Sequence, residues 1–141
     1  MIYFMDKLML ARQSELAIQS ELEHIERLHR IMKLPRRSPE YTAQLAEKLA
    51  KLERRLNNTV DLAVDRKNEA LNLLDSLAGN ERTVLYQYYI LAMSWEEVAE
   101  KMYMSDRNVY KLRKKAVDKL AAKYLKSDTL SENKKKRASG E

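Results

Sequence analysis

Cationic side chains gather in one segment of this chain. Residues 106–126 carry eight Lys or Arg residues and only two Asp. An apolar stripe with helical spacing runs through the same segment, which leaves the cations on the outer side of the predicted helix. A helix with one apolar face and one strongly basic face is typical of a surface that binds a polyanion. The sequence therefore predicts binding chemistry at residues 106–126, with DNA as the first candidate ligand.

Two short helices joined by a turn are expected to position this surface. Ser94 and Glu97 form the pattern of a capping box, in which the hydroxyl and the carboxylate each accept a hydrogen bond from the other residue's backbone N–H. The helix that they open should end near residue 102. Ser105 is expected to cap the next helix, over residues 106–125. This arrangement is a helix-turn-helix.

A third helix, over residues 81–91 with Asn80 as its cap, is expected just before these two. The apolar residues of the turn and of the two later helices can then form one small core; they are Val98, Ala99, Met102, Met104, Val109, Leu112, Ala116 and Leu120. With that core inward, the polar residues of the last helix point outward; they are Arg107, Asn108, Tyr110, Lys111, Arg113, Lys114 and Lys115. A helix placed in this way can enter a major groove about 12 Å wide.

The segment LYQYYILAMSWEEVAEKMYMSDRNVYKLRKKAVDKL resembles the region 4 helix-turn-helix of bacterial sigma factors, which reads the −35 promoter element. The residues that carry the resemblance are Val84, Leu85, Ser94, Glu97, Val98, Ala99, Ser105, Val109 and Ala116. Trp95, and the long helical segment in front, are more similar to small phage-encoded regulators of the ArpU and RinA type. Those regulators are implicated in late-gene transcription.

The resemblance implies a set of DNA contacts. Base contacts would fall on Asp106, Arg107, Tyr110 and Lys111. Phosphate contacts would fall on Ser94, Ser105, Asn108, Arg113, Lys114 and Lys115. The chemistry agrees, because Arg and Lys can address the acceptors of guanine and phosphate needs only charge and donors. The alternative for Arg113, Lys114 and Lys115 is an ordinary solvated helix face.

The sequence departs from the family pattern at two positions. Ala92 and Tyr103 stand where family members often have Gly. Tyr103 falls in the turn, where a left-handed residue is usual and a bulky side chain costs roughly 1 kcal/mol. We therefore expect this turn to be shaped differently, which would alter the aim of the recognition helix.

The first half of the chain is predicted to be a helical hairpin. Few turn residues (two Gly and two Pro) and 34% charged residues are typical of long helices. The first helix should cover residues 3–33, and a second should begin after Ser38 and Pro39. Apolar residues keep helical spacing in the first helix; they are Phe4, Leu8, Ala11, Ile18, Leu22, Ile25 and Met32, interrupted by Glu15 and His29. In the second helix a seven-residue repeat, interrupted by Arg66, predicts a coiled-coil seam; its members are Leu45, Leu49, Leu52, Leu56, Thr59, Ala63, Ala70, Leu73 and Leu77.

The predicted organisation is therefore all-α, with three parts. Residues 1–78 form a hairpin or oligomerisation arm, residues 79–125 the helix-turn-helix domain, and residues 126–141 a disordered basic tail. The arm carries a net charge of +1, and residues 79–141 carry +5. We expect a homo-oligomer, with a dimer favoured, that joins through the seam of Leu49, Leu52 and Leu56. The alternative is a monomer whose arm folds back on its own C-terminal helices. In the tail, Lys134 to Arg137 could add nonspecific phosphate contacts or only aid solubility.

An enzyme is not expected. The chain has no Cys, no glycine-rich phosphate loop and no paired acid and base. His24 and His29 lie five residues apart, on different faces of a helix, and make a poor metal pair. We expect no cofactor and no metal, no membrane span, and a location in the cytoplasm of a bacterial host.

Three functions fit these residues. The leading one is a sequence-specific DNA-binding transcription regulator that acts on double-stranded DNA, with RNA polymerase as a further candidate partner. A second is an interaction module that grips RNA polymerase and does not recognise a promoter alone. A third is a DNA-packaging protein of the small-terminase kind, in which the arms would form a ring. The operator sequence and the sign of regulation stay open.

Overall fold

The computed structural model describes residues 3–35 and 38–139, with side chains described as far as Leu125. Within these residues the fold is entirely helical, which confirms the predicted all-α class. The elements are α1 (Tyr3–Met32), α2 (Pro39–Leu74), α3 (Gly79–Leu85), the π-helical segment η1 (Tyr86–Ile90), α4 (Trp95–Lys101) and α5 (Asp106–Ser139).

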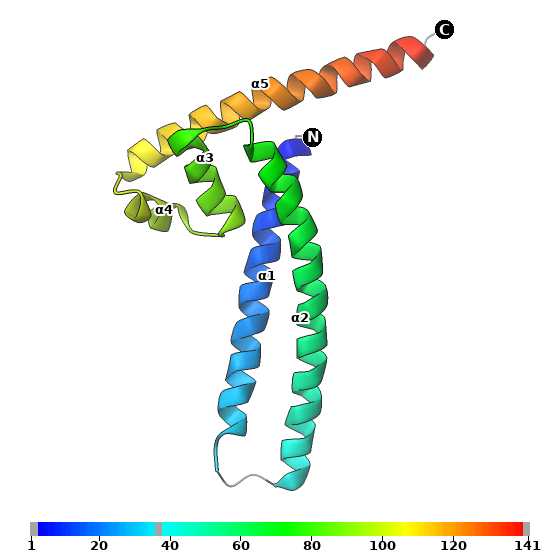
Figure 1. The fold of residues 1–141 in the computed structure, drawn as a ribbon, viewed down its shortest axis with the longest axis vertical. Coiled ribbons are helices and arrows are strands. Elements are labelled where there is room, and N and C mark those ends of the chain that lie inside the picture. Colours follow the sequence, from blue (N-terminus) through cyan, green and yellow to red (C-terminus); the bar gives the residue numbers. More distant parts are fainter. Residues whose placement is uncertain (1–2, 36–37, 140–141) are drawn as a thin grey trace.

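Helices α1 and α2 form the predicted antiparallel hairpin, and the shorter helices form a head beside its open end (Figure 1). Ser38 caps α2 as expected: its Oγ accepts from the N–H of Tyr41 at 3.1 Å. Pro39 takes the first helical position, where its missing N–H has no partner to lose.

The leucine seam of α2 packs against α1 of the same chain. At the closed end of the hairpin, Leu45 and Leu49 join Ile25 and Leu28 in one buried cluster, with Leu52 and Leu56 packed against it. Leu49 is only 9% exposed within the single chain. This seam is therefore occupied inside the hairpin. The prediction that it joins two chains is wrong, because it offers no free face to a second chain.

The inward face of α1 differs by one residue from the predicted one. Leu28 is buried, whereas the predicted seam residue Leu22 is 41% exposed. His29 is also exposed, and its Nε2 lies 3.9 Å from the carboxylate of Glu53 on α2. Ser14, rather than Glu15, is buried at the level of Arg66. The predicted and observed faces share Phe4, Leu8, Ala11, Ile18, Ile25 and Met32, so spacing alone could not separate them.

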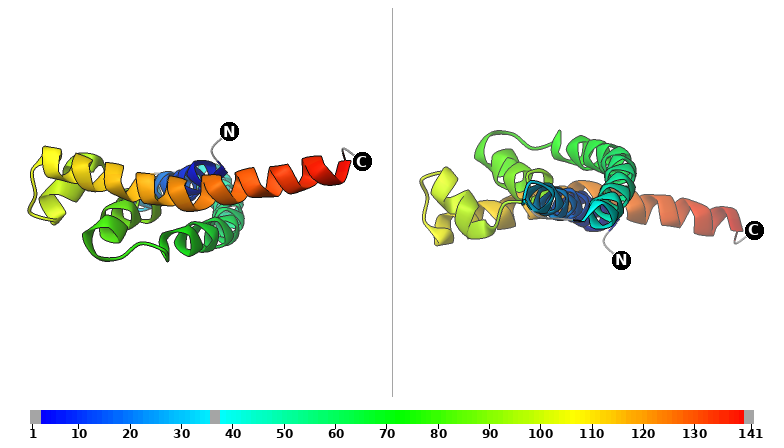
Figure 2. Two further views of the ribbon diagram at one scale, coloured as in Figure 1. Left: turned by 90° about the horizontal axis from the view of Figure 1, so that it is seen from above. Right: turned by 90° about the horizontal axis from the view of Figure 1, so that it is seen from below.

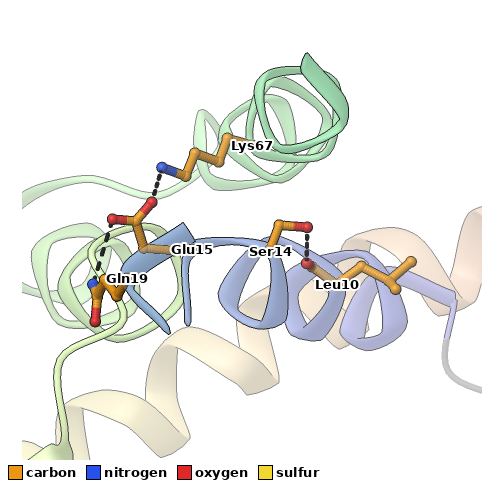
Figure 3. A network of polar contacts seen from close by, with 5 residues as sticks. All are labelled: Leu10, Ser14, Glu15, Gln19 and Lys67. Carbon is orange, nitrogen blue, oxygen red and sulfur yellow. Dashed lines mark hydrogen bonds and ion pairs between the residues drawn. The ribbon is translucent and has the colours of Figure 1, made fainter. Parts of the chain in front are cut away.

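The middle of the hairpin is held by polar contacts between α1 and α2. Arg66 donates to Ser14 Oγ at 3.1 Å, and Thr59 donates to Glu21 at 3.0 Å. Figure 3 shows Lys67 reaching across from α2 to Glu15, which also accepts from the amide of Gln19. Ser14 in turn donates to the carbonyl of Leu10 at 2.8 Å, also drawn in Figure 3. Arg66, the charged residue that interrupts the apolar seam of α2, is therefore hydrogen-bonded across the hairpin.

One apolar core crosses the predicted boundary between residues 78 and 79. Buried residues from both arm helices at the open end of the hairpin and from the head belong to a single cluster; among them are Phe4, Leu8, Ala70, Leu74, Val84, Leu85, Val98, Val109, Ala116 and Leu120. A three-helix head of this size buries little apolar surface alone, and the arm supplies the rest. The head and the open end of the arm therefore pack as one unit.

The start and end of the first head helix differ from expectation. Ala78, not Asn80, is the residue before α3, and it makes no side-chain capping bond. Gly79 adopts a left-handed backbone with φ of +58°, which a residue without Cβ takes at little cost. The helix then loosens into the π-helical segment η1, where the N–H of Leu91 donates to the carbonyl of Tyr86. Spacing of apolar residues does not predict a π-helical turn.

Helix α5 crosses the open end of the hairpin, with its N-terminal part beside α4 and its C-terminal part beyond the arm (Figures 1 and 2). Phe4 of α1 contacts Tyr124 of α5, with ring centroids 6.2 Å apart. The sequence predicted disorder after Leu125, whereas the helix continues to Ser139, because no Gly or Pro interrupts it before Gly140. The side chains of Lys134 to Arg137 lie outside the described part.

Candidate nucleic-acid interface

The helix-turn-helix is built by the predicted caps. Ser94 Oγ accepts from the N–H of Glu97 at 3.1 Å, and the Glu97 carboxylate accepts from the N–H of Ser94 at 3.4 Å, which completes the capping box. Ser105 Oγ accepts from the N–H of Asn108 at 3.2 Å and so caps α5. Both hydroxyls act as acceptors in these caps, which leaves each hydroxyl proton able to donate to a phosphate oxygen.

The turn between α4 and α5 keeps the left-handed residue that the family pattern has. Tyr103 adopts φ of +54°, and the N–H of Met104 donates to the carbonyl of Ala99 at 3.0 Å. The N–H of Tyr103 donates to the carbonyl of Glu100 at 3.2 Å, so the two bonds form a Schellman motif. The expectation of a differently shaped turn is therefore wrong. Tyr103 adopts this strained left-handed backbone conformation although it has a Cβ, and the residue is 98% exposed.

The first turns of α5 present an exposed basic face. Its apolar side is buried through Val109 and Ala116. Nearly all of the predicted contact residues of α5 and its cap are exposed; these are Ser105, Asp106, Arg107, Asn108, Tyr110, Lys111, Lys114 and Lys115. Arg113 and Ser94 are half-buried.

The cations of this face lack carboxylate partners. Within the described side chains, no ion pair involves Arg107, Lys111, Arg113, Lys114 or Lys115. In the arm, by contrast, Lys67 pairs with Glu15 and Arg55 with Glu21. Further along α5, Lys119 pairs with Glu81 of α3 at 2.7 Å. Some described cations of the arm, such as Arg30 and Lys48, are likewise in no ion pair. At the start of α5, however, five such cations lie within residues 107–115, and this local density of positive charge is expected of a surface that binds an anion.

Two of the hollows beside α5 differ in charge. One, of about 260 Å³, lies next to the start of α3; it is lined by Asn80, Met104, Asn108, Lys111, Leu112 and Lys115. The other, of about 330 Å³, lies next to the start of α4; it is lined by Trp95, Glu96, Asp106, Val109, Tyr110 and Arg113. Two carboxylates make the second hollow a poor place for phosphate. Of these two hollows, the one that includes Lys115 is therefore the better place for phosphate.

A column of stacked groups connects Arg113 to the arm. Its guanidinium lies over the Trp95 ring, 4.6 Å from the centroid. Trp95 stacks on Tyr88 with centroids 3.8 Å apart and planes 8° from parallel. The guanidinium of Arg12, from α1, lies over Tyr88 at 4.0 Å. Beside this column Tyr89 is buried, which raises the pKa of its hydroxyl above the ordinary value, although the positive charges of Arg113 and Arg12 partly oppose the rise.

Comparison with protein families agrees with this geometry. Residues 67–120 match the family model described as sigma-70, region 4. This segment is a sigma region 4-like helix-turn-helix domain. The match covers the end of α2, all of α3, η1 and α4, and the first half of α5. Searches of curated proteins and of solved structures found no match. The sigma region 4-like domain is a DNA-binding type, and the match includes the cations at the start of α5.

The structure brings the predicted base-contact residues to one end of α5, but it separates the predicted phosphate residues. Lys114 and Lys115 are exposed on the helix, whereas Arg113 is engaged with Trp95. Sequence reasoning missed Arg12. From its place in the apolar pattern, Arg12 would be read as an ordinary solvated residue of α1. Its contacts with Tyr88 and Met93 of the head arise only in the folded chain.

Among the described side chains, no group of three or more His, Asp or Glu residues is placed to hold a metal ion. None of the described helices is both long enough and apolar enough to span a bilayer.

Proposed function

We propose that this protein is a sequence-specific DNA-binding transcription regulator whose helix α5 enters the major groove. One observation carries the proposal: the exposed cations at the start of α5 lack ion-pair partners among the described side chains, within a sigma region 4-like helix-turn-helix. Such a helix places its first turns at the base edges.

The position of each residue on the helix determines whether it contacts a base or a phosphate. Arg107 and Lys111, one helical turn apart on the exposed ridge, address base acceptors such as guanine O6 and N7. Asp106 can accept from a cytosine amino group, and Tyr110 offers its ring and hydroxyl beside it. Lys114 and Lys115 lie further along the helix and contact phosphates. The hydroxyls of Ser94 and Ser105, with Asn108, supply further phosphate contacts at the helix starts.

The experiment is an unbiased selection of binding sites on the purified chain, followed by titration of single variants. Arg107→Ala and Lys111→Ala should each cost about 1–3 kcal/mol on the selected duplex and relax base preference at one position. Lys48→Ala, an exposed lysine of the arm, serves as the control. Equal losses on selected and random duplexes would assign both residues to the DNA backbone.

We propose a phage or prophage origin and a role with RNA polymerase at promoters. The support is the resemblance of Trp95 and the long preceding helical segment to small phage regulators, together with the sigma region 4-like match. Footprints of the chain with and without RNA polymerase test this role. Protection that requires polymerase would favour the interaction module over the independent DNA reader.

We also propose that the chain is a dimer that joins through the outer face of the arm, because the inner seam is filled. Leu22, Val60 and Val64 are 41%, 37% and 51% exposed, on the flank marked by the Glu15–Lys67 ion pair. Leu62 lies roughly 160° around α2 from Val60. Val64→Lys should reduce the mass measured by light scattering to that of one chain, and Leu62→Lys should not. A wild-type mass of one chain contradicts the dimer, and a mass of about eight chains would favour the packaging ring.

A further inference from the structure

The contact between Arg12 and the head joins two parts of the protein that are distant in sequence. The Arg12 guanidinium donates to the carbonyls of Tyr88 at 2.8 Å and of Met93 at 2.9 Å. It lies at the same time over the Tyr88 ring, at 4.0 Å from the centroid. One side chain of the arm therefore holds both the end of η1 and the segment that leads into α4.

These carbonyls need a donor because of how η1 ends. Ala92 adopts a left-handed backbone with φ of +57°, and the N–H of Met93 donates to the carbonyl of Gln87. The chain turns away after Leu91, so the Tyr88 carbonyl is left without the usual helical donor. A charged guanidinium at the negative end of a helix satisfies this carbonyl and interacts favourably with the helix dipole.

The same contact continues as a stack to the DNA-facing helix. The ring of Tyr88 stacks on the ring of Trp95, the first residue of α4. The guanidinium of Arg113, on α5, lies over the Trp95 ring. Both Tyr88 and Trp95 are half-buried, so the cations that stack on them are partly shielded from water. Cation–π contacts are stronger when they are shielded in this way. The column therefore ties the start of α4 to α5 on one side and to the arm on the other.

We propose that Arg12 is a positioning residue for DNA recognition, through which the arm sets the angle of α4 against the recognition helix α5. The inference rests on the proposed DNA-binding function. Nonspecific binding depends on the charge of α5, which Arg12 does not change. Specific binding depends in addition on the alignment of Arg107 and Lys111 with the base edges, and this alignment is what the column maintains.

The test uses the full chain and compares Arg12→Ala with Arg12→Lys. Lysine keeps the charge but lacks the planar group that both stacks on Tyr88 and donates to two carbonyls. Arg30→Ala, an exposed arginine at the far end of α1, is the control. Trp95 is the only tryptophan in the chain, so its emission reports the column directly and independently of DNA.

Arg12→Ala should change the Trp95 emission and its quenching by acrylamide, and weaken binding to the selected duplex by about tenfold. Binding to a random duplex should change by less than about twofold, because phosphate contacts are kept. Arg12→Lys should fall between the wild type and Arg12→Ala, and Arg30→Ala should match the wild type. A loss of equal size on both duplexes would show that Arg12 only stabilises the fold and would overturn the proposal.

Unchanged emission together with an unchanged ratio of specific to random affinity also overturns it. If the Arg12→Ala chain does not fold, the Arg12→Lys chain gives the same two readouts. A wild-type chain that prefers no duplex would instead contradict the proposed function, and the emission of Trp95 would still show whether the column links the arm to α4.

Discussion

Replacement of Tyr103 by glycine should stabilise this protein, although it removes an aromatic side chain. Tyr103 holds φ of +54° in the Schellman turn between α4 and α5. A residue with a Cβ in the left-handed region costs roughly 1–2 kcal/mol. The side chain is 98% exposed, so its removal sacrifices almost no packing. Relief of the strain is therefore the main effect on the folded state.

The gain is reduced by the greater freedom of glycine in the unfolded chain, which costs about 0.4–1 kcal/mol. The net expectation for Tyr103→Gly is an increase of about 0.5–1 kcal/mol in the free energy of unfolding. For a chain of this length that corresponds to a rise of about 2–4 °C in the melting temperature. Both N–H donors of the turn are kept, so the recognition helix should hold its place.

The assay is urea and thermal unfolding followed by circular dichroism at helical wavelengths. Tyr103→Ala is the matched control, because it removes the ring but keeps the Cβ and hence the strain. Its unfolding midpoint should stay near that of the wild type, with the same dependence on urea. If the alanine variant gains as much as the glycine variant, the exposed ring is the destabilising feature and the argument from backbone strain is refuted.

Further outcomes follow from the same structure. Lys114→Ala should reduce the slope of log affinity against log salt by about one, and an unchanged slope would mean that Lys114 contacts no phosphate. Leu28→Ala should destabilise the hairpin by about 2–5 kcal/mol, whereas Leu22→Ala on the exposed side should cost far less; equal costs in urea unfolding would contradict the observed α1 seam. Burial raises the pKa of Tyr89, so the stability tied to its neutral form is fully present below the unfolded pKa near 10 and is lost as the pH rises through the higher folded pKa. The free energy of unfolding should therefore fall above about pH 10, and fall less steeply in Tyr89→Phe.

The local features of this fold could be predicted from the sequence. The capping box of Ser94 and Glu97, and the caps at Ser38 and Ser105, depend on residues within three positions of one another. Short-range hydrogen bonds of this kind leave a direct mark in the sequence, and with the apolar spacing they predicted the hairpin and the helix-turn-helix.

Features that depend on tertiary contact could not be predicted in the same way. The seam of α1 has two registers with the same spacing, and packing against α2 selects the one that buries Leu28 and Ser14. The link from Arg12 to Tyr88 joins residues 76 positions apart. The contact between Arg113 and Trp95 belongs to the same stacked column. The turn at Tyr103 was predicted wrongly because the cost of a left-handed tyrosine, about 1–2 kcal/mol, is small beside the packing that fixes the turn.

In the proposed function, the exposed start of α5 reads bases from the major groove. Methylation protection on the selected duplex tests it most directly, because dimethyl sulfate reports guanine N7 in the major groove and adenine N3 in the minor groove. The wild-type chain should protect guanine N7 within the site, and Arg107→Ala should lose protection at one position while its neighbours stay protected. Protection confined to adenine N3, or a pattern that Arg107→Ala leaves unchanged, would contradict it.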